Sequence, residues 1–207
     1  SGFLVGIIEG SSRGFKEQWT GDLMIVNRNE KQYIEHTSDI ESVISSFPQI
    51  KSYTKRIVAG AKIEANWDEK RKEEDANIVS NQIAGIDPEK EDLTTHLSAQ
   101  IVEGEWLKPG DSRGIMIGSG YLKEYSRVAD LVALLHDVHP GTIVRVTVSG
   151  KKLASGSPVP EDNMTAKEDL TTIGSVTQDF IVRGIINSKV QFVASRAYIL
   201  DSELNKM

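Results

Sequence analysis

The chain has 207 residues, with 39% hydrophobic and 26% charged side chains, proportions that are ordinary for a soluble globular protein. Its formal net charge of −6, without a cluster of basic residues, excludes the usual nucleic-acid binders, which present a basic face to the phosphates. Cysteine is absent, so thiolate metal sites, thiol nucleophiles and disulfides are excluded for these residues. No apolar stretch approaches the ~20 residues that cross a bilayer, and no secretory signal pattern is visible.

Residues 1–66 predict the order helix, strand, helix, strand. Apolar residues three and four apart favour a first helix, which three glycines weaken. The stretch "GDLMIVNRN" then indicates a strand bounded by turn residues. The stretch "TSDIESVISSF" indicates a helix that Thr37 or Ser38 caps and Pro48 ends. Finally, "IKSYTKRIVAGAKIEA" alternates enough for one long strand or two short ones.

The middle of the chain is expected to be rich in strands. After a charged turn at 66–77, "IVSNQIAGI" predicts a strand that stops at Asp87 and Pro88. Proline suits the first position of a helix, and Asp87 can accept hydrogen bonds from the free amides that follow, so a short helix is expected there. Glycines and Pro109 indicate loops in "IVEGEWLKPGDSRG". A strand is expected at "IMIG", and "SGYLKEYSRVADLVALLHDV" is expected to be mostly helix.

The last third predicts two more strands and a final helix. The stretch "HPGTIVRVTVSG" indicates a turn and an alternating strand, "SVTQDFIVRGIINSKV" a second strand, and "AYILDSELNKM" a turn into a helix. Between the strands, residues 151–170 are polar and rich in Pro, Ser and Gly, as in a loop. We therefore expect an α+β protein with two lobes. An α/β lobe would combine 1–66 with 176–207, and 70–175 would be an inserted, mostly-β lobe.

Two glycine patterns hint at chemistry, and local structure accounts for both. Residues 10–14 spell G-x-S-x-G, in which Ser12 would be a hydrolase nucleophile, but no strand precedes it as that motif requires. A turn of a weakened helix is the preferred interpretation. The stretch "IMIGSG" contains G-x-G after a strand, but Lys123 stands where a dinucleotide-binding loop needs its third glycine. A tight turn is expected there.

His136, Asp137 and His139 lie together just before Pro140 and Gly141. The two histidines, three positions apart on an expected helix, could share a metal ion, but neither His36 nor His96 stands out as a further ligand. Histidines at the end of a helix more often interact with its dipole, which is the preferred interpretation. The acidic run "DEKRKEEDA" indicates a solvated turn, and no P-loop is present. We therefore expect no catalytic, cofactor-binding or metal-binding residue and no cofactor.

The order of several short stretches resembles a known family. These stretches are "QIAGIDPEKE", "IVEGEWL", "GIMIGSGYLKEY", "PGTIVRVTV" and "DFIVRGIINSKVQFVASRAYI". Together they resemble the extracytoplasmic core domain of ABC transporter permeases of the MacB/FtsX/LolC–LolE superfamily. The stretch "GDLMIVNR" is similar to the family's early strand, so the resemblance spans nearly the whole chain. The matching residues are Gly85, Asp87, Pro88, Glu91, Gly104, Gly118, Gly141, Phe180, Val182 and Gly184.

The resemblance implies a domain held outside the cytoplasm on a membrane-anchored permease. One membrane helix would precede the domain and three would follow it. A separate ATP-binding subunit would hydrolyse ATP, and a second permease copy would complete the assembly. An extracytoplasmic adaptor or lipoprotein is a possible further partner. Motion between the porter-like lobe and the inserted lobe, at junctions near 66–70 and 175–180, would transmit the change.

The chain departs from the family pattern in two places. The stretch "SRVADLVALLHDVH" is longer than the segment usual there, which predicts an extra helix. Family members would also continue after Met207 into a second strand–helix unit, without which a sheet edge is left uncovered. Two other functions stay open at this point: a free-standing extracytoplasmic binding or adaptor module, and a hydrolase that uses Ser12.

Overall fold

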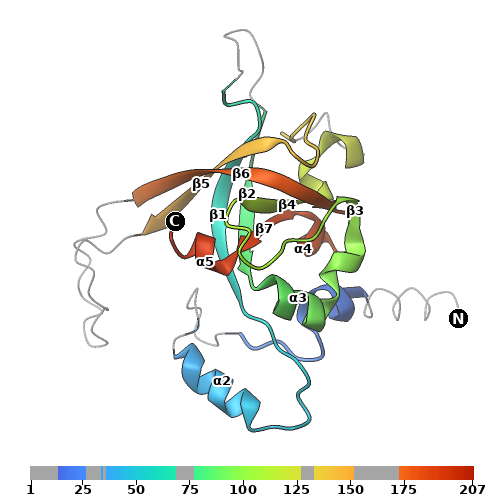
Figure 1. Cartoon of the computed structure of the whole chain (residues 1–207), viewed down its shortest axis with the longest axis vertical. Coiled ribbons are helices and arrows are strands. Elements are labelled where there is room, and N and C mark those ends of the chain that lie inside the picture. Colours follow the sequence, from blue (N-terminus) through green and yellow to red (C-terminus); the bar gives the residue numbers. More distant parts are fainter. Residues whose placement is uncertain (1–13, 27–33, 35, 69–76, 127–132, 152–172) are drawn as a thin grey trace, which may run out of the picture.

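The computed structural model describes residues 14–26, 34, 36–68, 77–126, 133–151 and 173–207. Their strands form one sheet in the order β3-β6-β4-β7-β2-β1-β5, and β5 also pairs with β6. This additional pairing closes six of the strands into a barrel, while β3 lies outside it and pairs with β6. Figure 1 shows the barrel with α3, α4 and α5 around it and α2 set apart below it.

The elements have the following bounds. The strands are β1 (Arg56–Glu64), β2 (Ile78–Ile86), β3 (Ile101–Gly104), β4 (Gly114–Gly118), β5 (Ile143–Lys151), β6 (Ile173–Ile186) and β7 (Arg196–Leu200). The α-helices are α2 (Thr37–Ser45), α3 (Pro88–Thr95), α4 (Gln191–Ala194) and α5 (Asp201–Leu204). Single helical turns are η1 (Lys16–Thr20), η2 (Leu97–Gln100), η3 (Ser119–Tyr121) and η4 (Lys123–Tyr125).

The long strand β6 closes the barrel because it pairs with β5 on one edge and with β4 on the other. Its first part pairs antiparallel with β5, from Ile173 opposite Lys151 to Ile181 opposite Ile143. From Ile181 to Ile186 its opposite edge pairs parallel with β4, and Gly184–Ile186 also pair antiparallel with β3 on the edge away from β4. On the far side, β1 joins β5 only over its last four residues, Ala61–Glu64.

The central strands are buried on both faces, as expected for strands covered by helices outside the barrel. Alternate residues of β4 and β7 belong to two apolar clusters. Ile115, Ile117 and Ile199 belong to the larger cluster with Phe180 of β6. Met116 and Tyr198 belong to the second cluster, in which they pack with Val190, Val193, Leu97 and Trp19. The fold is thus built on these two cores.

The α+β class and most predicted elements are confirmed. The expected helix of "TSDIESVISSF" is α2, and Asp87 and Pro88 begin α3 as predicted. Four expectations about secondary structure are wrong for the described residues. Residues 22–26 are not a strand, 101–104 are a strand rather than a loop, and β7 stands where a turn was expected. No extra helix appears among the described residues of 119–138, where η3 and η4 are single turns; residues 127–132 lie outside the described part.

Strands assigned from the sequence to different lobes share one sheet. From the chain ends, β1 pairs with β2 and β5, and β7 pairs with β2 and β4. Residues 175–180, expected to be a junction, lie inside β6 and pair with β5. The other expected junction, 66–70, is described only up to residue 68. A hinge at 175–180 would therefore have to break strand pairing.

No helix in the part of the chain that the structure describes is long and apolar enough to cross a membrane.

Candidate functional site

The N-terminal segment, residues 14–21, docks on the barrel through Trp19. The guanidinium carbons of Arg56 and Arg196 each lie 4.2 Å from the centroid of the Trp19 ring. Arg56 comes from β1 and Arg196 from β7, so the ring bridges two strands. A guanidinium that stacks on an aromatic face is attracted by the ring's quadrupole. We call Trp19, Arg56, Arg196 and Glu91 the Trp19 junction.

Glu91 of α3 neutralises Arg56 in a buried ion pair. The Glu91 side chain is fully buried and that of Arg56 is 13% exposed. Arg56 Nε donates to both carboxylate oxygens, at 3.1 and 2.9 Å, and Nη2 donates to Oε1 at 2.5 Å. Thr95 and Thr54 hydroxyls also donate to Glu91. Such a pair is tolerated in a core only when its hydrogen bonds are this complete.

Arg56 also holds the backbone of the N-terminal segment. Its Nη1 donates to the carbonyl oxygen of Trp19 at 2.7 Å. Arg56 therefore contacts Trp19 twice, through the ring and through the main chain. The Arg56 side chain thus connects β1, α3 and the N-terminal segment.

Arg196 is the second arm of the junction, and its charge is less well compensated. Nε and Nη2 donate to the side-chain oxygen of Gln82, at 3.1 and 2.6 Å, whereas Nη1 is buried and has no partner among the described residues. Burial lowers the pKa of Arg196, and the positive charge of Arg56 lowers it further. The Trp19 ring is the group that offsets this cost.

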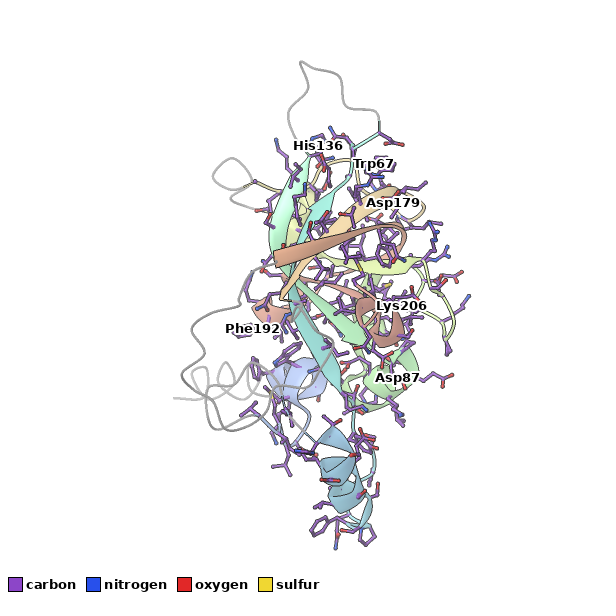
Figure 2. All side chains as sticks on the ribbon, turned by 90° about the vertical axis from the view of Figure 1, so that its left-hand side faces the viewer. Trp67, Asp87, His136, Asp179, Phe192 and Lys206 are labelled. Atoms are coloured by element: carbon purple, nitrogen blue, oxygen red, sulfur yellow. The ribbon has the colours of Figure 1, made fainter. Side chains whose placement is uncertain are left out.

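Two further contacts fix the segment on the same side of the barrel. The Ser188 hydroxyl donates to the side-chain oxygen of Gln18. Phe15 meets Phe192 of α4 edge to face, with ring centroids 6.1 Å apart. Figure 2 shows Phe192 close to this N-terminal helical turn. The segment leaves the junction at Gly21, whose φ of 61° is easily adopted only without a side chain.

These contacts hold the N-terminal segment in a fixed position on the barrel. The polar groups of the junction are two guanidiniums, a paired carboxylate, an amide and hydroxyls, without an activated nucleophile. Among the described residues no group of three or more His, Asp or Glu could hold a metal ion. The Trp19 junction is a mechanical connection between the chain's N-terminal segment and its barrel.

Three of the sequence-predicted residues lie on α3 beside this junction. Asp87 caps the helix, because its Oδ1 accepts from the backbone amides of Glu89 and Lys90, both at 3.2 Å. Pro88 occupies the first turn, and its carbonyl accepts from the Trp106 indole at 3.1 Å. Glu91 follows one turn later and points into the core. The "GIDPEKE" stretch thus places the carboxylate that Arg56 needs.

Three predicted glycines meet at another corner of the barrel. Gly104 of β3 lies opposite Gly184 of β6, and the Gly141 amide donates to Val182 of the same strand at 2.8 Å. Gly104 has a φ of +78°, and a Cβ there would lie 2.8 Å from the Gly184 Cα. Gly104 and Gly184 thus allow β3 and β6 to approach closely, whereas a Cβ on Gly141 would meet no atom within 4 Å and its φ of +98° is what favours glycine; these roles are structural.

The remaining two glycines are each covered by a neighbouring element. A Cβ on Gly85 of β2 would lie 3.0 Å from the Cα of Asp201, at the start of α5. A Cβ on Gly118 would lie 2.5 Å from the Arg196 carbonyl oxygen. The G-x-G after β4 is therefore filled by protein backbone, and η3 rather than an α-helix follows it. The predicted site residues do not form a single centre.

The other candidate residues lie outside the described part of the chain or contact different partners. Ser12 lies outside the described residues. His136 and His139 are not at the end of a helix, because 133–139 are not helical. Instead His136 Nδ1 lies 3.0 Å from Asp137, and His139 Nδ1 lies 3.3 Å from Glu103 of β3. Their separate partners offer no shared metal site.

The residues that form the junction were missed from the sequence, apart from Glu91. Arg56 is 35 positions from Glu91 and 37 from Trp19, and Gln82 is 114 from Arg196. No local pattern reports contacts at such separations. The one available signal was Trp19 itself, a large aromatic residue in an otherwise glycine-weakened helix.

A scan against models of known protein families finds no match to this chain, and a search of curated proteins finds none.

Proposed function

We propose that this chain is the extracytoplasmic domain of an ABC-type permease subunit and passes ATP-driven motion from the membrane to a partner outside the cytoplasm. The proposal starts from the ordered set of motifs that resembles the MacB/FtsX/LolC–LolE superfamily. A separate subunit would bind and hydrolyse ATP, and a second permease copy would complete the assembly. The domain itself would carry no catalytic residue.

The single observation that carries the proposal is the Trp19 junction. A domain that transmits motion needs a stiff connection between the segment that enters it and its body. Trp19, held between Arg56 and Arg196 and by its own carbonyl, is such a connection. By the resemblance, the segment before it leads to the first membrane helix.

The sites of the family-like residues support the same proposal. Gly104, Gly118 and Gly184 occupy positions where a side chain would meet backbone, and Asp87 and Glu91 build and anchor α3. Residues with such roles are expected to recur wherever this fold is used. In this proposal the porter-like and inserted parts are two stretches of chain that build one barrel and move together.

The location can be tested in intact cells that express the whole parent protein with its ATP-binding partner. These 207 residues contain no cysteine, so Ser175→Cys at an exposed position of β6 gives this domain one thiol. A membrane-impermeant maleimide should label it without lysis. Labelling only after lysis would contradict the proposal. Recovery of the labelled protein in the soluble extracellular fraction would instead favour a free-standing module.

A further inference from the structure

A surface cleft between α2 and α3 shares no residue with the Trp19 junction. It has a volume of about 340 Å³ and six apolar or aromatic lining residues: Ile44, Phe47, Pro48, Ile50, Tyr53 and Leu93. Its first five come from the end of α2 and the segment leading to β1, and Leu93 comes from α3. Figure 2 shows α2 below Asp87 and the start of α3.

Large apolar side chains are left open to solvent at this cleft. Leu93 is 65% exposed, Phe47 52% and Ile50 39%, and Val43, one helical turn before Phe47, is 58% exposed. None of the nine residues of α2 is buried. Short helices in proteins take most of their stability from packing an apolar face. An apolar cluster of this kind marks a contact surface for another molecule.

The charges around the cleft indicate what that molecule carries. Among the described residues, Lys51 and Lys90 are the only charged ones that line it, although the chain as a whole has a net charge of −6. Lys51 has no ion-pair partner within the described part of the chain. Lys90 has a long contact to Asp87, at 3.6 Å, and its side chain is 55% exposed. Both amines are therefore available to carboxylates at the rim.

A second copy of this chain fits the cleft poorly. A two-fold interface brings the same patch of both copies together, and the described lining has two lysines and no carboxylate, so the lysines of one copy would find no charged partner in the other. A bilayer surface also fits poorly, because it has no apolar ridge to fill a hollow. An amphipathic helix provides such a ridge, flanked by side chains of chosen charge.

We propose that this cleft binds an amphipathic helix with acidic flanks from a partner protein. The apolar ridge of the helix would contact Phe47, Ile50 and Leu93, and its carboxylates would pair with Lys51 and Lys90. This inference does not depend on the proposed permease function.

The test uses the 207-residue chain and two synthetic helical peptides of about 18 residues each. Both carry the same leucine face, but one has glutamate and the other lysine on the polar face. We expect the acidic peptide to bind at least about tenfold more tightly in a fluorescence anisotropy titration. The double variant Lys51→Glu, Lys90→Glu should reverse this preference. The matched control Lys62→Glu, Lys123→Glu, with both changes away from the cleft, should keep it.

The apolar contribution has a separate test. Phe47→Asp should weaken the acidic peptide at least about tenfold while leaving the thermal midpoint unchanged, since this side chain is half exposed. Equal binding of both peptides, no binding of either, or indifference to the charge reversal would overturn the proposal. Self-association abolished by Phe47→Asp would assign the cleft to a second copy instead. Binding to anionic lipid vesicles with the same dependence on Phe47 would assign it to a membrane; both results overturn the proposal.

Discussion

The barrel and the α2 region of this protein use apolar residues in opposite ways. In the barrel, Ile83, Met116 and Phe180 are fully buried, and strands from both chain ends share the sheet. In the α2 region no helical residue is buried, and Phe47 and Val43 face solvent. The barrel therefore holds itself together, whereas the α2 region depends on what it contacts. We infer that one part is the rigid body and the other the contact surface.

The Trp19 junction belongs with the barrel in this comparison. It ties a segment early in the chain to β1, α3 and β7 through a buried ion pair and two stacked guanidiniums. The α2 region follows that segment in sequence, and among the described residues its ion pair joins Glu41 to the half-exposed Lys55 at the surface.

Removal of the buried carboxylate should cause the largest loss. Glu91→Gln leaves the Arg56 guanidinium in the core without its counter-charge, and we expect a loss of about 3–5 kcal/mol in the free energy of unfolding. Urea denaturation measures it. Glu89→Gln, on an exposed position of the same helix, should change that free energy by less than about 0.5 kcal/mol. Equal effects of the two variants would contradict the stabilising role of the buried Glu91–Arg56 ion pair.

A methyl group at Gly118 should be the next most damaging change. Its carbon would lie 2.5 Å from the Arg196 carbonyl, so β4 and β7 must shift, at a cost of about 2–3 kcal/mol. Gly60→Ala in β1 is the matched control, because its Cβ meets no atom within 4 Å. We expect it to be neutral or to stabilise by up to about 1 kcal/mol. Thermal unfolding of both variants measures the contrast, and similar losses would contradict the packing at Gly118.

Loss of the indole should release the N-terminal segment at moderate cost. Trp19→Leu removes two cation–π contacts, worth about 1–2 kcal/mol together, and should speed tryptic cleavage after Lys16. Trp67→Leu is the control, since Trp67 stacks on Arg145 at 3.4 Å elsewhere on the barrel. It should cost similar stability without speeding cleavage after Lys16. Equal cleavage rates in the two variants would show that Trp19 does not hold the segment.

The smallest effect concerns pH and the contact of β3 with its neighbours. The hydroxyl of Tyr125 and then His139 lower the pKa of Glu103 below its usual 4.5. Because the folded pKa is depressed, the stabilisation is present above the unfolded value and is lost as pH falls through the folded one. Glu103 is about one-third exposed, so the loss should stay below about 1 kcal/mol. Tyr125→Phe should reduce the drop in the urea midpoint between pH 7 and about pH 4; an unchanged drop would contradict the link.

Local chemistry made part of this fold predictable. Asp87 and Pro88 begin α3 because a side-chain acceptor and a residue without an amide suit the first turn, and both signals are visible in the sequence. Alternation likewise predicted β5. The helix expected from "VADLVALLHDV" is absent over its described residues, 133–138, because Leu135 pairs in extended form with Leu122 and Asn77 binds the backbone of His136. Leu122 and Asn77 lie outside the stretch itself, so the helical spacing of its apolar residues alone led to a wrong prediction.

The barrel and the junction could not be predicted for the same reason. Closure depends on β6 pairing with β5 on one edge and with β4 on the other, with Ile181 opposite both strands, which is a property of the register between strands. The sequence instead suggested two lobes, because 66–77 is charged and 151–170 is polar. Of the junction, only Glu91 was singled out, through its place in a motif rather than through its partner Arg56.

The most direct test of the central claim measures whether the N-terminal segment and the barrel move as one body during the ATP cycle. Spin labels at Glu17→Cys and Ser175→Cys, both exposed, would report the distance between them in the whole parent protein with the ATP-binding partner that we propose for it. We predict the same distance with and without ATP, while the distance between Ser175→Cys labels of the two permease copies changes. A nucleotide-dependent change between Glu17→Cys and Ser175→Cys within one copy, or no change between copies, would contradict the account.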